Sequence, residues 1–135
     1  MKFLLDTNII LELILEQTKA EEVRALLEKA DQNDFFISDF SLHSIGLLLF
    51  RRKLHHIFSE FLTDMLIRAG VIVMTLSSEE MESVINAALR FNLDFDDAYQ
   101  YVSAEKYDLT ILSFDSDFDR TEHGRKTPSE VLIKK

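Results

Sequence analysis

The stretch "TILSFDSDF" (residues 110–118) decides how the rest of the chain is interpreted. Its opening residues, Thr-Ile-Leu, have the apolar and β-branched character of a buried strand. Two carboxylates follow at once, Asp115 and Asp117. A strand needs only a turn to end it, and capping of the next element would account for such a residue. The sharper interpretation is that the strand delivers both carboxylates to a metal ion.

Working outward, short apolar segments alternate with helical patterns along the whole chain. We predict strands at residues 2–5, 35–37, 71–76 and 109–114, and helices at 9–16, 20–30, 42–53, 55–69, 77–91 and 94–106, with a short final element from 127. Thr7 or Asn8 is the expected cap of the first helix. Strands separated by helices favour a parallel sheet covered on both faces. The predicted fold class is therefore α/β: one domain over residues 1–135, a three-layer α/β/α sandwich with a central, mostly parallel sheet of four to five strands.

Composition narrows the class of protein. The chain has 135 residues, 47% of them apolar, which is enough for a real core. It has no cysteine, which excludes a disulfide scaffold, a thiolate zinc site and a cysteine nucleophile. The four histidines do not show the spacing of a zinc site. The first charge after the start, Asp6, comes too early for a signal-peptide core, and the apolar runs are too short to span a bilayer, so we expect a cytoplasmic protein without a membrane partner.

Carboxylates follow three of the four predicted strands, at Asp6, Asp39 and Asp115. Ligands of parallel sheets bind beyond the carboxyl ends of the strands. Asp97 is a further candidate, although Asp94 as a cap with Asp97 in the first turn is an ordinary helix start. Carboxylates that converge repel one another unless a cation binds. Their hard oxygen atoms suit Mg²⁺ or Mn²⁺, which activate water for phosphodiester cleavage.

The net charge of −9 argues against a broad basic face that tracks nucleic acid. It does not exclude a nuclease, because bound cations make an acidic site much less negative toward a phosphate. A basic cluster at residues 51–53 is either a solvated face or a contact for RNA phosphates.

Three stretches carry a family resemblance: "FLLDTNIIL" near the start, "NLDFDDAYQYVSAEKYDLTILSFDSDF", and "KTPSEVL" at the end. Together they resemble the PIN domain, and in particular the VapC-type toxin ribonucleases of bacterial and archaeal toxin–antitoxin pairs. The resemblance covers essentially the whole chain. It implies a ribonuclease that depends on Mg²⁺ or Mn²⁺, an RNA substrate, and inhibition by a small antitoxin protein.

The resemblance also implies roles for individual residues. It gives catalytic and metal-binding roles to Asp6, Asp97 and Asp115, with Asp117 as an auxiliary acid at the metal. Asn8 corresponds to the polar residue that supports the first acid. Ser113 corresponds to the small hydroxyl residue before the last acid.

One position departs from the family pattern. The family commonly has a glutamate in the helix after the second strand, and aligning Ser38 with the strand end puts Ser44 there. The loss of a carboxylate predicts weaker metal affinity. Asp39 could compensate, but we interpret it as the cap of the next helix. The alternative function is therefore a catalytically weakened PIN-like module that acts by binding RNA or protein.

Two further points concern partners and rivals. The run "IGLLLF" (residues 45–50) is too continuously apolar for a solvated helix, which predicts a homodimer or an antitoxin surface. The D-x-D strand of haloacid-dehalogenase-like phosphatases is the rival interpretation of "TILSFDSDF". That machinery needs further acids and a lysine downstream, and the segment after Phe118 is too short to supply them.

Overall fold

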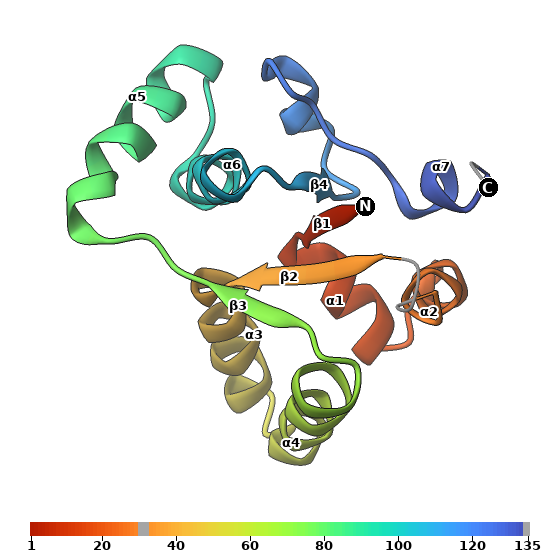
Figure 1. Ribbon diagram of the computed structural model, residues 1–135. Coiled ribbons are helices and arrows are strands. Elements are labelled where there is room, and N and C mark those ends of the chain that lie inside the picture. The colour runs from red at the N-terminus through yellow and green to blue at the C-terminus, as the bar shows by residue number, and fades with distance from the viewer. Residues whose placement is uncertain (30–32, 134–135) are drawn as a thin grey trace.

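The computed structural model describes residues 1–29 and 33–133, and its centre is a four-stranded parallel sheet (Figure 1). The strands are β1 (Lys2–Leu5), β2 (Asp34–Ser38), β3 (Ile72–Met74) and β4 (Thr110–Leu112). Their order is β3-β2-β1-β4, and every pairing is parallel. Beyond β4, Lys126 forms an isolated parallel bridge to Leu112. The predicted parallel sheet of four to five strands is confirmed.

Side chains of β1 alternate between the two faces of this sheet. Phe3 and Leu5 enter one hydrophobic cluster, and Leu4 enters the other. Leu4 lies level with Phe36 on β2 and with Ile111 on β4. Successive residues of a strand point to opposite faces, so a fully apolar strand needs a cover on both sides. The near-continuous apolar run of β1 is therefore explained by its place inside the sheet, where both faces are covered.

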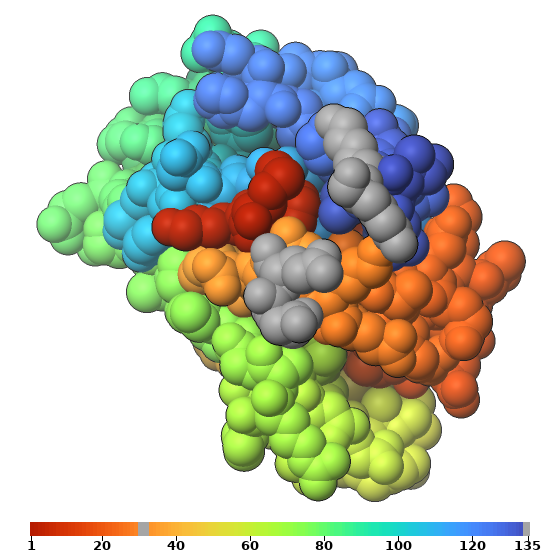
Figure 2. Space-filling model, turned by 45° about the vertical axis from the view of Figure 1, so that its right-hand side comes forward, coloured from red at the N-terminus to blue at the C-terminus, as the bar shows by residue number. Residues whose placement is uncertain are grey.

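Helices provide that cover on each face (Figure 1). One cluster packs under α1 (Thr7–Ile14), α2 (Ala20–Leu27), α3 (Asp39–Arg51), α4 (His55–Phe61) and η1 (Leu62–Arg68), with α7 (Pro128–Ile133) beside it. The other packs under α5 (Met81–Phe91) and α6 (Phe95–Tyr107). Short 3₁₀ turns, η2 (Ser78–Glu80) and η3 (Ser116–Arg120), complete the fold. Figure 2 shows the dark blue α7 against the orange α2. The predicted three-layer α/β/α sandwich is confirmed.

Some predicted elements differ from the structure in helix type or in extent. The helix predicted at 55–69 is α4 followed by a π-helix, η1, and the strand predicted at 71–76 pairs only over Ile72–Met74. This strand lies at the sheet edge, where Ile72 is 49% exposed. The last residue of the helix predicted at 20–30 lies outside the described residues. Within the described part, no helix is long and apolar enough to span a membrane.

Two helix caps also differ from the prediction. Asp6, and not Thr7 or Asn8, caps α1, because its backbone is extended and its carboxylate accepts a hydrogen bond from the Thr7 amide at 2.8 Å. Ser38, and not Asp39, caps α3, and its hydroxyl accepts from the Ser41 amide at 3.0 Å. Asp6 directly follows β1, and Ser38 is the last residue of β2. The chain therefore turns from strand to helix without a loop at both places. This brings side chains of α1 and α3 to the carboxyl edge of the sheet.

Candidate active site

An acidic cavity of about 260 Å³ lies at the carboxyl edge of the sheet. β1 and β4 are neighbours in a parallel sheet, so Asp6 and Asp115 reach the same edge. The start of α6 closes the cavity from the side. Its wall consists of Asp6, Thr7, Asn8, Leu11, Phe40, Ser44, Asp94, Asp96, Asp97, Gln100 and Asp115.

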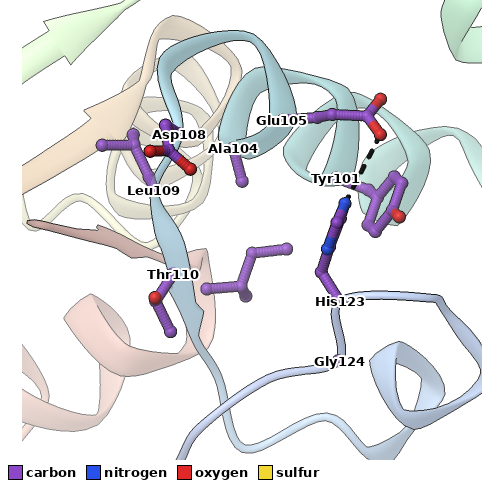
Figure 3. Close-up of a pocket in the computed structure, with 9 residues that line it drawn as sticks. Tyr101, Ala104, Glu105, Asp108, Leu109, Thr110, His123 and Gly124 are labelled. Carbon is purple, nitrogen blue, oxygen red and sulfur yellow. Dashed lines mark ion pairs between the residues drawn. The ribbon is translucent and has the colours of Figure 1, made fainter.

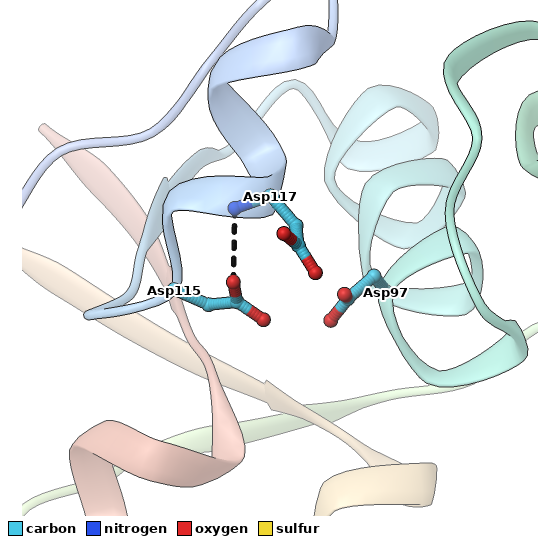
Figure 4. A group of neighbouring side chains, drawn as sticks. All are labelled: Asp97, Asp115 and Asp117. Carbon is cyan, nitrogen blue, oxygen red and sulfur yellow. Dashed lines mark hydrogen bonds between the residues drawn. The ribbon is translucent and has the colours of Figure 1, made fainter.

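Three carboxylates approach one another here (Figure 4), and two of them, Asp97 and Asp115, line the cavity. Asp97, Asp115 and Asp117 each offer an oxygen atom, and these atoms lie within 4.8 Å of one another. Asp97 stands in the first turn of α6, where its amide donates to Asp94 at 3.1 Å. Asp115 caps η3 and accepts from the Asp117 amide at 2.9 Å. Asp94 and Asp115 are thus helix caps, as the capping interpretation of these aspartates predicted. The same local geometry brings the carboxylates together.

Asp6 is a buried acid of the site, with 7% of its surface exposed. One carboxylate oxygen accepts from the Ser113 hydroxyl at 2.7 Å. The other accepts from the side-chain amide of Gln100 at 3.2 Å and from the Thr7 amide. These three donors fix the orientation of a carboxylate that would otherwise repel its neighbours.

Asn8 joins the two strand ends. Its side-chain nitrogen donates to the Ser113 hydroxyl at 3.3 Å, and its side-chain oxygen accepts from the Phe114 amide at 3.2 Å. The Ser113 hydroxyl also accepts from the Asp115 amide at 2.9 Å. Asn8 and Ser113 therefore link Asp6 to Asp115, and their supporting role stays a prediction.

Sequence reasoning missed two members of this network, Gln100 and Ser41. The Gln100 amide donates to the Ser41 hydroxyl at 2.6 Å as well as to Asp6. Thr7 donates its hydroxyl to the same Ser41 oxygen at 2.8 Å. The side-chain oxygen of Gln100 is buried and has no hydrogen-bond partner among the described residues. Its spacing of three from Asp97, on one face of α6, is the signal that could have found it.

Crowding and burial change the acidity of the site. Burial, followed by the charges of Asp94, Asp115, Asp6 and Asp117, raises the pKa of Asp97 to about 8. Burial also raises the pKa of Asp6 above its ordinary value, against the three hydrogen bonds that lower it. A proton or a cation at Asp97 would relieve the repulsion among these carboxylates.

Asp117 differs from the other acids, because Arg120 partly neutralises it. The guanidinium of Arg120 lies 3.1 Å from the Asp117 carboxylate and also donates to the carbonyl groups of Phe91 and Asn92. This ion pair weakens the electrostatic attraction between Asp117 and a cation. The geometry suits an auxiliary acid better than a principal ligand.

Ser44 and Asp39 lie differently with respect to the acidic cavity. Ser44 lines the acidic cavity. Asp39 does not line it: its carboxylate accepts from the Tyr99 hydroxyl at 2.7 Å, the Thr75 hydroxyl at 2.9 Å and the Phe40 amide. Asp39 therefore holds α6 and the end of β3 against α3, and does not supply the missing carboxylate.

A second cavity, of about 240 Å³, lies near the start of β4 (Figure 3). His123 faces Glu105 across it at 3.6 Å, and the His123 ring stacks on Tyr101. Thr110 opens β4 at this cavity, whereas Asp115 follows the other end of the strand. None of the predicted site residues lines it, so the acidic cavity is the candidate active site.

The fold and the acidic strand-end cavity define the class: a small α/β/α domain of the kind that gathers carboxylates at the carboxyl edge of a parallel sheet. The chain belongs to the PIN domain family, whose model matches residues 3–124. Nucleases of this family are generally endoribonucleases that use divalent metals.

Solved structures of similar fold include toxin–antitoxin proteins. VapBC2 from Rickettsia felis, bound to a DNA fragment from their promoter, is 18% identical over 93% of this chain and 97% of that one, with a TM-score of 0.77. FitAcB from Neisseria gonorrhoeae is 21% identical over 94% and 98%, with a TM-score of 0.72. VapC20 from Mycobacterium tuberculosis, a sarcin-ricin loop cleaving toxin, is 19% identical over 90% and 95%, with a TM-score of 0.73. A comparison with curated protein sequences gives no significant match.

Proposed function

We propose that this protein is a divalent-metal-dependent endoribonuclease and the toxin of a toxin–antitoxin pair. The observation that carries the proposal is the convergence of Asp97, Asp115 and Asp117 within 4.8 Å, beside the buried Asp6. Carboxylates at this separation are stable together only with protons or a cation. Their oxygen atoms fit Mg²⁺ or Mn²⁺, which prefer such ligands.

Asp6, Asp97 and Asp115 would hold the ion, with Asp117 as the auxiliary acid. When bound, the ion lowers the pKa of water and stabilises the leaving oxygen of a phosphodiester. Asp97 would give up its proton on binding the ion, because its pKa of about 8 keeps it largely protonated at neutral pH without a cation. Ser113 and Gln100 keep the Asp6 carboxylate directed at the cavity throughout.

Two apolar surfaces support the proposed protein partners. A groove of about 350 Å³ between α1, α2, α4 and η1 is suited to the apolar side chains of a small antitoxin; its apolar lining consists of Leu13, Ile14, Leu27, Ile57, Phe61 and Met65. On α3, Leu47 and Phe50 are each 54% exposed, which supports a homodimer. The toxin–antitoxin complexes among the similar structures support an antitoxin partner.

The alternative function is a PIN module with weakened catalysis that acts by binding RNA or protein. Ser44 favours it, because a hydroxyl group lines the acidic cavity where relatives commonly have a carboxylate. One fewer negative ligand lowers the affinity for a cation and leaves part of its coordination to water.

Cleavage of a mixed RNA pool separates the two functions. Wild-type protein in Mn²⁺ should cut RNA, and both EDTA and Asp97→Asn should reduce the rate by a factor on the order of 10² or more. Asp96→Asn is the matched control, since it removes the same charge from the same helix turn, and it should cost much less. Equal cleavage by wild type and Asp97→Asn, with and without EDTA, would rule out the proposed activity.

A further inference from the structure

Aromatic side chains gather at the rim of the acidic cavity. Phe40 lines the cavity, and its ring meets the Phe95 ring edge-on with the centroids 5.8 Å apart. Phe95 stands between Asp94 and Asp96, which also line the cavity, yet 52% of its surface is exposed. A large apolar side chain thus remains in solvent directly beside the carboxylates.

Phe95 is supported from behind. The Tyr99 ring, which is 6% exposed, contacts both Phe95 and Phe40 with centroids 5.9 Å away. The Tyr99 hydroxyl donates to Asp39 and accepts from the Leu76 amide at 3.1 Å. The Phe95 ring is therefore held in place by its aromatic neighbours. A ligand that stacks on it loses little free energy in ordering the side chain.

Charge around the cavity makes such a contact useful. The chain carries a net charge of −9, and the cavity wall contains five aspartates. Two arginines near the strand ends are already paired, Arg120 with Asp117 and Arg125 with Asp119. Contacts to phosphates, which dominate most nucleic-acid binding, are therefore weak here beyond the proposed metal. Stacking on an aromatic ring needs no positive charge.

We infer that Phe95 is a stacking platform for an unpaired nucleobase next to the phosphate in the acidic cavity. The inference rests on the proposed function for the position of that phosphate, and it adds to that function a residue that would contact the substrate away from the metal. A base can lie on Phe95 only when it is out of a duplex, so the ring selects single-stranded or loop RNA. Phe95 is a specificity-determining residue in this assignment, and it takes no part in the chemical step.

Fluorescence tests the stacking directly. The chain contains no tryptophan, so Phe95→Trp introduces a single indole at the rim. Leu89→Trp is the control, because Leu89 is also exposed, at 80%, but lies on α5 and does not line the acidic cavity. Each variant is mixed with a short single-stranded RNA or with an abasic strand of equal length, in Mg²⁺ and in EDTA, and read before cleavage proceeds. We expect the base-containing RNA to quench Phe95→Trp, and the abasic strand to leave both variants unchanged.

Kinetics provide the second measurement. Phe95→Ala and Phe95→Leu should lower kcat/KM on single-stranded RNA by about 5- to 150-fold, the range for loss of one stacked base. Phe95→Tyr should restore it, whereas leucine, with similar apolar bulk but no aromatic face, should not. On a substrate that is abasic at the stacked position, all four proteins should be equal.

The outcomes separate this inference from the proposed function. Quenching of Phe95→Trp with no RNA cleavage by wild type would overturn the nuclease and leave Phe95 as an RNA contact. Cleavage by wild type without quenching of Phe95→Trp would overturn the stacking and leave the nuclease. An emission shift that depends on protein concentration and ignores RNA would place Phe95 between two copies of the chain, and would also overturn the stacking.

Discussion

Replacing Asp97 by asparagine should stabilise the metal-free protein. Asp97 is 7% exposed and surrounded by other carboxylates, and burial with these charges raises its pKa to about 8 from an ordinary 3.8. Asparagine has nearly the same shape and keeps the backbone amide that donates to Asp94. The substitution removes the charge at every pH. It therefore also removes the free energy that the folded protein loses when this carboxyl group ionises.

The sign and size follow from linkage. The folded pKa is raised, so the stabilising effect of the Asp97 proton is fully present below pH 3.8 and is lost as pH rises toward 8. The loss is at most about 1.4 kcal/mol for each pH unit, and roughly 4 kcal/mol at pH 7. Water in the open cavity and local relaxation reduce this figure. A quarter of it, about 1 kcal/mol, corresponds to a Tm shift of roughly 4 °C in a domain of this size.

Thermal unfolding in EDTA from pH 4 to pH 9 provides the assay. Asp97→Asn should melt above wild type at pH 7, and the difference should shrink toward pH 4. The control Glu79→Gln, at an exposed site, should follow wild type throughout. Added Mn²⁺ should reverse the order, because only wild type keeps the ligand. A difference that stays constant with pH, or a less stable Asp97→Asn in EDTA, would refute the reasoning.

Three more predictions follow from the same geometry. Ser44→Glu should melt below wild type in EDTA and gain more from Mn²⁺, since a restored ligand or supporting acceptor is worth roughly 10- to 100-fold in affinity; parallel responses would place Ser44 away from the ion. Gln100→Ala should weaken Mn²⁺ binding in calorimetry by about 10- to 100-fold, because Asp6 loses an orienting donor, and unchanged affinity would contradict this role. Light scattering should show a dimer for wild type and a monomer for Leu47→Glu with Phe50→Glu; a wild-type monomer across the micromolar range would exclude the homodimer.

Local sequence was enough to predict the sheet and most of the acidic cluster. The apolar run of β1 and the end of "TILSFDSDF" are read from neighbouring residues, and parallel strands bring their ends to one edge by geometry alone. Asp6, Asp97 and Asp115 therefore lie near one another as predicted. The helix cap at Asp94 was also predicted, and it is confirmed by the hydrogen bond to the Asp97 amide.

The rest depends on contacts between distant residues. Gln100 reaches Asp6 across 94 positions of the chain, and Tyr99 reaches Asp39 across 60. Ser38 and Asp39 are both good caps by type, and the choice falls to Ser38 because Tyr99 and Thr75 engage the Asp39 carboxylate.

The most direct test of the acidic cavity as a metal site is anomalous diffraction at the manganese edge from crystals soaked in Mn²⁺. We predict a peak within coordination distance of the Asp97 and Asp115 carboxylates and adjacent to Asp6, and its loss in crystals of Asp97→Asn. A protein that cleaves RNA while its crystals show the manganese elsewhere, or show none at these residues, would contradict the account.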